Sequence, residues 1–524
     1  MITSNIIAGK EIQGSGKTFK GQNPATQKAI DGDFEIATLE NVNQAVGAAV
    51  EAFKVFKNTS GKKKAELLRT IASEIEAIGD SLIQRAVQES GLPEGRFKGE
   101  RGRTCGQLRM FADLVEDGSW VEARIDEAQP ERKPIPRVDI RNMLQSLGPV
   151  VIFGASNFPL AFSTAGGDSA SALAAGCPII VKAHPSHPGT NALVSEAIAK
   201  ALEKCDLPAG IFSTLYDDGY SIGAALVQHP DITAVGFTGS EGGGKALMNL
   251  ASQREFPIPV YAEMGSTNPV FILPEKLNQE LDTLPTVIAN SINMGVGQFC
   301  TNPGLLFVQE DENLDAFNIN LMRAFEHLNA YTMLNEGIHK NYTKKRKSAI
   351  KTEGVSPIHI NDHTAGTLAA PPTIVKVSYG QFLQNPSLHE EVFGPFTMMV
   401  ICKDKSEMIN LAQNLKGQLT STFMGTESDL LANQELIDIV KNKVGRIVFN
   451  GVPTGVEVGH AMHHGGPYPA SSNGRYTSVG TGAIKRFARP VALQNCPDSL
   501  LPDALKKNNP LGIWRMVNGE MSKS

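Results

Sequence analysis

Residues 149–183 read PVVIFGASNFPLAFSTAGGDSASALAAGCPIIVKA, and the β-rich runs PVVIFGA and CPIIVKA flank a helical stretch of small residues. The alternation continues with a helical segment at 187–205 (HPGTNALVSEAIAKALEKC), a β-rich run at 234–240 (AVGFTGS) and a further helical segment at 245–251 (KALMNLA). Short strands that alternate with helices predict a mostly parallel, doubly wound α/β sheet.

A second alternating series begins near residues 259–265 (PVYAEMG) and continues to 445–450 (GRIVFN). Upstream, residues 38–120 repeat apolar positions every three or four residues, which predicts amphipathic helices that pack on the sheet. We therefore expect two doubly wound domains, with a boundary near Pro259, and a small β arm. The predicted units are 1–129 with 148–258, then 259–477, and an arm made of 130–147 and 478–524.

Composition narrows the classes of partner. The 524 residues contain 49 Lys and Arg against 54 Asp and Glu, a net charge of −5, so no broad positive field would attract nucleic acid or an anionic membrane. No apolar run approaches the roughly 20 residues of a membrane span. Six separated cysteines form no CxxC pair, which favours a reducing cytoplasm. A small molecule is the expected partner. The arm and the apolar tail predict a homodimer or homotetramer.

Three polar residues lie in contexts suited to catalysis. Cys300 follows several glycines in NMGVGQFCTNPG, where backbone amides can stabilise a thiolate or an oxyanion. Glu263 ends the apolar run PVYAE, where burial would raise its pKa towards that of a general base. Asn157 follows a strand and has an amide that can donate to an oxyanion. Taken singly, each has a structural alternative: an inert buried thiol, a salt-bridged interior acid and a turn residue.

Two further segments are suited to a phosphate-bearing cofactor. Residues 235–245 (VGFTGSEGGGK) combine a strand, a Gly239-Ser240 turn and a helix start, which presents N–H groups to a phosphate. They do not match the G-x-G-x-x-G fingerprint of dinucleotide-binding folds. Lys182 ends a strand and is placed to bind ribose hydroxyls or a phosphate.

The ordered motifs resemble those of the aldehyde dehydrogenase superfamily along nearly the whole chain. They are Asn157-Phe158-Pro159, Lys182, Gly239-Ser240 to Gly244, Glu263-Met264-Gly265, Gly297-Gln298-Phe299-Cys300, Glu391-Val392-Phe393-Gly394-Pro395 and Phe449-Asn450-Gly451. Within it, segments such as FGASNFPLAFSTAGGDSASALAAGCP and GGPYPASSNGRYTSVG resemble the 2-oxoglutarate semialdehyde (2,5-dioxopentanoate) dehydrogenases of sugar-acid breakdown. The resemblance implies a dinucleotide-binding first domain and a second domain that carries the nucleophile.

The resemblance also implies a role for each matching residue. Cys300 would attack the aldehyde to give a thiohemiacetal, Asn157 would hold the oxyanion, and Glu263 would activate the water that hydrolyses the thioester. The implied cofactor-binding residues are Lys182, Gly239, Ser240, Gly244, Glu391 and Phe393. Many NAD-using relatives carry a Glu three residues after the Lys, and Pro185 stands there in this chain. Without that carboxylate, Lys182, His184 or a nearby Ser can bind a 2′-phosphate, which favours NADP and leaves NAD possible.

A dicarboxylic semialdehyde requires a cation or several hydroxyls for its remote carboxylate. The expected substrate residues are Phe158 and Phe162 in the tunnel wall and Arg103, Gln107 and Arg109 on a bordering helix, with the choice between the two arginines open. A broader-range, NADP-dependent dehydrogenase of fatty or other aliphatic aldehydes is the alternative activity, and a catalytically silent relative is the non-enzymatic one. His460, His463 and His464 do not form a two-histidine helical face, so we predict no metal site.

Overall fold

The computed structural model describes residues 1–360 and 366–523. Its first domain is built on a seven-stranded sheet in which the five strands β9 to β13 run parallel and β1 pairs antiparallel with β11. In spatial order the strands are β13 (Val260–Glu263), β12 (Ala234–Thr238), β9 (Val150–Phe153), β10 (Ile179–Lys182), β11 (Phe212–Leu215), β1 (Asn5–Ile7) and β2 (Lys10–Ile12).

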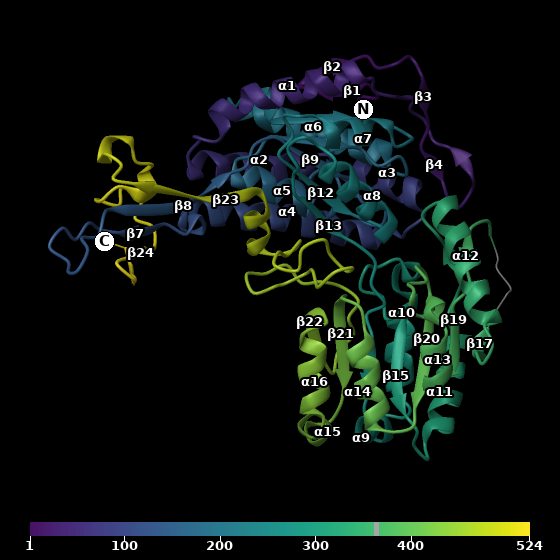
Figure 1. Cartoon of the computed structure of the whole chain (residues 1–524). Helices are drawn as coiled ribbons and strands as arrows, with labels where there is room; N and C mark the ends of the chain where they lie inside the picture. The colour runs from purple at the N-terminus through teal and green to yellow at the C-terminus, as the bar shows by residue number, and fades with distance from the viewer. Residues whose placement is uncertain (361–365, 524) are drawn as a thin grey trace.

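Helices cover both faces of this sheet because alternate strand residues point to opposite sides. Val151 and Ile180 pack with α1 and α7, whereas their neighbours Val150 and Ile179 pack with α2 and α6 on the other face. The predicted doubly wound arrangement is therefore present (Figure 1). The helices are α1 (Leu39–Phe56), α2 (Gly61–Ala77), α3 (Asp80–Ser90), α4 (Glu94–Asp117), α5 (Gly167–Ala175), α6 (Pro188–Lys204), α7 (Ser221–Gln228) and α8 (Glu241–Ser252).

The second domain repeats this architecture with a mostly parallel sheet whose strand β17 is antiparallel. Its strands, in order, are β17 (Ser356–Ile360), β19 (Thr373–Ser378), β20 (Phe396–Cys402), β15 (Leu305–Gln309), β14 (Val270–Ile272), β21 (Gln418–Met424) and β22 (Val444–Phe449). Its helices are α9 (Pro274–Gln279), α10 (Leu284–Asn293), α11 (Leu314–Glu326), α12 (Glu336–Lys351), α13 (Tyr379–Gln384), α14 (Lys405–Asn414), α15 (Glu427–Ala432) and α16 (Gln434–Lys441).

A third sheet forms the arm and extends away from both domains (Figure 1). Its order is β23 (Ala488–Gln494), β8 (Ile140–Ser146), β7 (Arg124–Asp126), β24 (Arg515–Val517) and β25 (Glu520–Ser522). The predicted start of the arm at residue 130 lies too far along the chain, because β7, at residues 124–126, pairs with β8 and belongs to the same sheet.

The predicted boundary near Pro259 is wrong by one strand. β13 pairs in parallel with β12 and so completes the first sheet, and the second sheet begins with β14. Residues near 464–478 also depart from the predicted division, because they return from the second domain to the edge of the first sheet. There the Ser472 N–H donates to the Ala262 carbonyl at 2.9 Å, and Glu263 forms an isolated β-bridge with Ser471.

The parallel strands of the first sheet end at one edge, where ligand-binding groups gather in open α/β sheets. Asn157 follows β9, Lys182 ends β10, Ser240 follows β12 and Glu263 ends β13. Across the described residues, none of the helices combines the length and the apolar character that crossing a membrane requires.

Candidate active site

Cys300 lies in the turn-rich segment between α10 and β15, and its thiol is half-buried. Gly297 has φ +63°, and a Cβ there would lie 2.2 Å from the backbone carbon of Gly394, so only glycine fits. Asn268 donates from Nδ2 to the Cys300 carbonyl at 2.9 Å and to the Asn302 carbonyl at 2.9 Å. The nucleophile predicted from sequence is thus held by backbone contacts on both sides of the turn.

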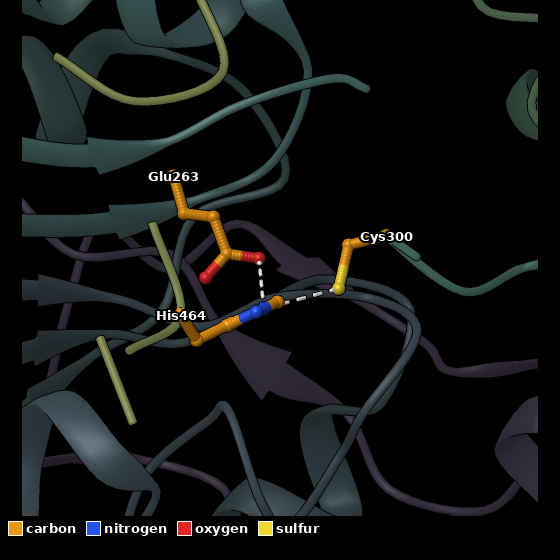
Figure 2. Close-up of side chains that lie close together, drawn as sticks. All are labelled: Glu263, Cys300 and His464. Carbon is orange, nitrogen blue, oxygen red and sulfur yellow. Dashed lines mark hydrogen bonds and ion pairs between the residues drawn. The ribbon is translucent and has the colours of Figure 1, made fainter. Parts of the chain in front are cut away.

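Glu263 and His464 meet next to this thiol (Figure 2). The His464 Nε2 lies 2.9 Å from Glu263 Oε1 and 3.4 Å from Cys300 Sγ. Ser478 donates from Oγ to Glu263 Oε2 at 2.5 Å and to the His464 carbonyl at 3.1 Å. Both oxygens of the buried carboxylate are therefore occupied.

The expectation of a raised pKa at Glu263 is wrong. Burial does act to raise it, but the contacts of the carboxylate with His464, Ser478 and Cys300 outweigh burial, and the pKa of Glu263 is lowered. The pKa of Cys300 is raised well above its usual value by burial and by the charge and hydrogen bond of Glu263. The resting site therefore holds a neutral thiol beside a carboxylate.

Sequence reasoning considered His464 only as a metal ligand and missed its place beside the nucleophile. Its backbone N–H donates to Thr477 Oγ1 at 2.8 Å, which ties the GHAMHHGG segment to the loop that carries Ser478. The signal available in the sequence was a histidine in a glycine-rich segment, but nothing in the local pattern indicates a partner 164 positions away.

Asn157 donates from Nδ2 to the Gln298 carbonyl at 3.0 Å, within the segment that leads to Cys300. Arg96, which sequence reasoning also missed, donates to the Asn157 carbonyl at 3.2 Å and lies over the rings of Phe158 and Phe299, at 4.3 and 4.7 Å from their centroids. The side-chain amide of Asn157 carries two N–H bonds. One donates to the Gln298 carbonyl, so the other can donate to an oxyanion near the Cys300 thiol.

Phe158 and Phe162, the two residues predicted for the tunnel wall, are in contact. The Phe158 ring packs edge-on against Phe162 at 5.3 Å and against Phe299 at 5.2 Å. Because Phe299 directly precedes Cys300 in the chain, these rings lie next to the segment that carries the thiol.

The three polar residues of α4 predicted to bind the substrate lie in different surroundings. Arg103 lies over the Phe162 ring at 5.8 Å and donates to the Val456 carbonyl. Gln107 is buried against α5, where a Cβ at Gly167 would lie 2.8 Å from its Nε2. Arg109 points away and forms two hydrogen bonds with Glu76 of α2, at 2.8 and 2.6 Å. The structure does not bring Arg109 to the thiol.

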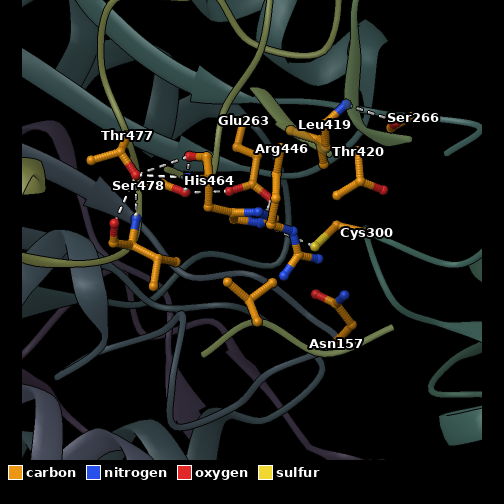
Figure 3. A network of polar contacts seen from close by, with 12 residues as sticks. Asn157, Glu263, Ser266, Cys300, Leu419, Thr420, Arg446, His464, Thr477 and Ser478 are labelled. Carbon is orange, nitrogen blue, oxygen red and sulfur yellow. Dashed lines mark hydrogen bonds and ion pairs between the residues drawn. The ribbon is translucent and has the colours of Figure 1, made fainter. Parts of the chain in front are cut away.

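Arg446 of β22 is a second guanidinium that sequence reasoning did not single out. It donates to the carbonyls of Pro453 at 2.8 Å and Gly455 at 3.2 Å, so it and Arg103 hold the same loop. Figure 3 shows its guanidinium directed towards Cys300, and its positive charge attracts the thiolate form of that residue. The Nε atoms of Arg103 and Arg446 are buried and make no hydrogen bond within the described part of the chain.

The cofactor residues predicted around β12 have distinct positions. Ser240 caps α8 by accepting from the Gly243 N–H at 3.1 Å, and a Cβ at Gly242 would meet nothing within 4 Å, so the first turn of the helix has open space beside it. Gly244 instead allows α8 to pack closely, since a Cβ there would lie 2.5 Å from Met264 Sδ. At Gly239 a Cβ would lie 2.6 Å from the Phe237 ring.

At the end of β10, Lys182 donates from Nζ to the Asp217 carbonyl at 2.7 Å. His184 stacks on His187 with ring centroids 5.4 Å apart, and its Nδ1 accepts from the Ser186 N–H at 3.1 Å. Burial holds the pKa of His184 well below its usual value, so this ring is neutral at pH 7. Pro185, between them, is half-buried.

Glu391 and Phe393 line a pocket with Lys345 and Glu390. A Cβ at Gly265 would lie 2.7 Å from Glu391 Oε2, so the carboxylate lies close to the end of β13. Burial raises the pKa of Glu391 to about 7. A separate, smaller pocket is lined by Glu263, His464 and Ser478.

Comparison with known sequences decides the family. Residues 12–490 match the aldehyde dehydrogenase family. The chain belongs to this family. It is therefore an NAD(P)-dependent oxidoreductase of aldehydes, and the resemblance inferred from the motifs is confirmed. It is 46% identical over 521 residues to alpha-ketoglutaric semialdehyde dehydrogenase 2 of Azospirillum brasilense, covering 99% of both chains. It is 45% identical to alpha-ketoglutaric semialdehyde dehydrogenase of Acinetobacter baylyi, covering 99% of this chain and 98% of that one.

Solved structures agree on the fold. A 3,6-anhydro-L-galactose dehydrogenase superimposes with a TM-score of 0.80 at 20% identity, covering 94% of this aldehyde dehydrogenase and 99% of that chain. Betaine aldehyde dehydrogenase from Staphylococcus aureus, in complex with NAD+, gives a TM-score of 0.80 at 19% identity, covering 94% and 96%. The predicted fold class is thus confirmed.

Proposed function

We propose that this aldehyde dehydrogenase oxidises 2-oxoglutarate semialdehyde (2,5-dioxopentanoate) to 2-oxoglutarate, as a step of sugar-acid or pentose catabolism. The observation that carries the proposal is the 45–46% identity, over almost the full length, to two alpha-ketoglutaric semialdehyde dehydrogenases. The arrangement around Cys300 supports it, because a nucleophile, a carboxylate and two guanidinium groups with unpaired nitrogen atoms lie in one region.

Cys300 Sγ attacks the aldehyde carbon and its proton passes to the carboxylate of Glu263, beside which His464 Nε2 lies. The oxygen of the thiohemiacetal accepts hydrogen bonds from Asn157 Nδ2 and the Cys300 N–H. Bound NAD(P)+ supplies the hydride acceptor. After Glu263 has released the thiol proton to solvent, it takes a proton from the water that attacks the thioester and passes it to the departing Cys300 thiolate, which releases 2-oxoglutarate and restores the thiol.

Residues of both domains suit the cofactor. The open space beside the first turn of α8 and the Ser240 cap suit a pyrophosphate, and Lys182 at the end of β10 suits the adenosine ribose. Glu391 would accept hydrogen bonds from the nicotinamide ribose, with Phe393 beside it.

We assign the remote carboxylate of the substrate to Arg103 and Arg446. Each holds the loop at 453–456 through carbonyl groups and keeps a buried Nε without a hydrogen-bond partner among the described residues. A buried N–H of this kind is costly unless a ligand occupies it. An aliphatic aldehyde would leave both donors unsatisfied, which disfavours the broader-range alternative.

The test compares kcat/KM for 2-oxoglutarate semialdehyde and hexanal in the wild type, Arg103→Met and Arg109→Met. We expect the dicarboxylic substrate to be preferred, and Arg103→Met to lose roughly 30-fold or more with it while hexanal changes little. Arg109→Met, which removes an arginine of the same helix that pairs with Glu76, is the matched control and should behave as wild type. A higher kcat/KM for hexanal in the wild type would refute the substrate assignment.

For the cofactor we propose a preference for NADP. Pro185 replaces the ribose-binding carboxylate of many relatives, and both carboxylate oxygens of Asp217 accept backbone N–H groups, from Gly219 at 2.9 Å and Ile222 at 3.1 Å. Lys182 is then the cation for a 2′-phosphate, since His184 is neutral at pH 7. The ratio of kcat/KM for NADP+ and NAD+ tests this, and a ratio of about ten or more in favour of NAD+ would overturn it.

The arm is proposed to join subunits in a homodimer or homotetramer. Ile135, Val138 and Ile140 are 68%, 38% and 37% exposed in the β7–β8 connection and at the start of β8, where a second copy would cover them. Sedimentation of the full chain tests this, and a monomer at micromolar concentration would refute it. All six cysteines are unpaired, which fits the cytoplasm as the expected location, and fractionation would check it.

A further inference from the structure

Three potential metal ligands converge beside the nucleophile, from three separate parts of the chain (Figure 2). Cys300 Sγ, His464 Nε2 and an oxygen of Glu263 all lie within 4.8 Å of one another. Two of the separations are 3.4 Å, from Sγ to Nε2, and 2.9 Å, from Nε2 to Oε1. A tetrahedral zinc ion with ordinary bond lengths spaces such ligand atoms by about 3.4–3.6 Å. Zinc binding would thus require each of these two distances to change by about half an ångström at most.

We propose that Cys300, His464 and Glu263 form an inhibitory binding site for a thiophilic divalent cation such as Zn²⁺. A thiolate, an imidazole and a carboxylate favour zinc over magnesium or calcium, which prefer sets of oxygen ligands. The thiolate and the carboxylate together neutralise the charge of the ion, which matters because Glu263 and His464 are buried. A water molecule on the open side of the half-buried thiol completes the tetrahedron.

Binding exchanges a proton for the metal: the Cys300 S–H bond is replaced by an S–Zn bond and the proton leaves to solvent. The ion then blocks the sulfur lone pair that attacks the aldehyde, so the inhibitory consequence rests on the proposed function, whereas the binding itself does not. Because the proton must leave, the metal binds more tightly as pH rises.

The site is expected to bind reversibly rather than to hold a resident ion. A ligating histidine usually donates its other ring N–H to a partner, which orients the ring and strengthens ligation. His464 Nδ1 is buried without a hydrogen-bond partner in the described part of the chain. We therefore expect a dissociation constant nearer micromolar than the values of structural zinc sites.

The test uses Co²⁺ as a spectroscopic probe of the full-length enzyme, followed by Zn²⁺ inhibition of aldehyde oxidation. The wild type should give a thiolate-to-cobalt charge-transfer band and the visible bands of a tetrahedral site, displaced by one equivalent of Zn²⁺. His464→Ala should weaken Zn²⁺ binding by at least about tenfold, and so should Glu263→Gln. His463→Ala is the matched control, because the neighbouring histidine lies outside the cluster, and it should leave binding unchanged.

The proposal would be overturned by the absence of a thiolate-to-cobalt band in the wild type, by equal loss of binding in His463→Ala, or by Zn²⁺ inhibition that His464→Ala does not change. The last would mean that the metal attacks Cys300 alone. Excess Mg²⁺ should neither inhibit nor displace cobalt, and displacement by Mg²⁺ would also contradict the assignment. The cobalt spectrum does not depend on turnover, so a failure of the substrate assignment and a failure of the metal site are separate outcomes.

Discussion

The contact between Glu263 and the thiol predicts that removing the carboxylate makes Cys300 more reactive while abolishing turnover. The negative charge of Glu263 and its hydrogen bond are, after burial, the largest of the causes that raise the pKa of Cys300. Glu263→Gln keeps the size of the side chain and removes the charge. The variant should therefore hold a more acidic thiol, although it lacks the base that activates water for thioester hydrolysis.

The magnitude follows from the geometry. The reactive atoms lie within 4.8 Å of each other, so at an effective dielectric constant of about 20 the repulsion between thiolate and carboxylate is about 3 kcal/mol. Removing this repulsion increases the thiolate fraction at pH 8 by roughly 100-fold. The intrinsic nucleophilicity falls with the pKa, by about tenfold for the same change, so the net alkylation rate should rise by about tenfold.

The assay is alkylation of Cys300 by iodoacetamide, a neutral reagent, followed by mass spectrometry from pH 6 to pH 10. Cys496 is the other half-buried cysteine, and Cys496→Ser removes its background. Ser478→Ala, which takes away the hydrogen bond at 2.5 Å but keeps the charge of Glu263, is the control and should shift the midpoint much less. A midpoint that stays in place or rises in Glu263→Gln would refute the reasoning, since Glu263 would then promote deprotonation of the resting thiol.

Three more predictions concern the rest of the site. Asn157→Ala should lower kcat by about 10²–10³-fold through loss of the oxyanion donor, with little change in cofactor affinity by fluorescence titration, and an unchanged kcat would exclude that role. The pKa of Glu391, about 7, predicts that NAD(P)+ binds more tightly as pH rises, because the carboxylate form accepts hydrogen bonds from the ribose hydroxyls. The association constant should increase by up to about tenfold between pH 6 and pH 8, and Glu391→Gln should make it independent of pH over this range. Gly297→Ala should lose activity and soluble yield, because a Cβ would lie 2.2 Å from the Gly394 backbone, whereas Gly380→Ala, where a Cβ meets nothing within 4 Å, should match wild type in both measurements.

Much of the fold can be predicted because local sequence patterns specify it. The alternation of strand and helix from residue 149 onward specifies a parallel sheet, and the amphipathic helices before residue 120 cover it as predicted. The prediction places β13 in the wrong domain, because its sequence indicates a strand but does not indicate which sheet the strand joins. Val260 pairs with Val235, which belongs to the preceding unit.

In the candidate site, as in the fold, the residues that can be predicted are those with a signal in their local sequence. Cys300, Glu263 and Asn157 stand in segments whose glycines and strand ends carry a local signal, and the structure brings these segments close together. Arg109 and Arg103 could not be told apart by sequence, because the choice depends on which face of α4 meets Glu76 of α2. Arg446 gave no signal at all, since an arginine in a strand is ordinary until the loop that it holds is seen.

The position of His464 depends on a feature that joins the two domains rather than on the local pattern around it. The returning segment is fastened along the edge of β13, where the Met264 N–H donates to the Ala470 carbonyl at 2.8 Å and Ser472 donates from Oγ to the Val260 carbonyl at 2.6 Å. These contacts cover the exposed edge of the first sheet, which an open parallel sheet must protect. The same contacts place His464 and Ser478 on the two oxygens of Glu263. The segment that covers the edge of the first sheet thus also supplies the two partners that lower the pKa of Glu263, the carboxylate beside Cys300.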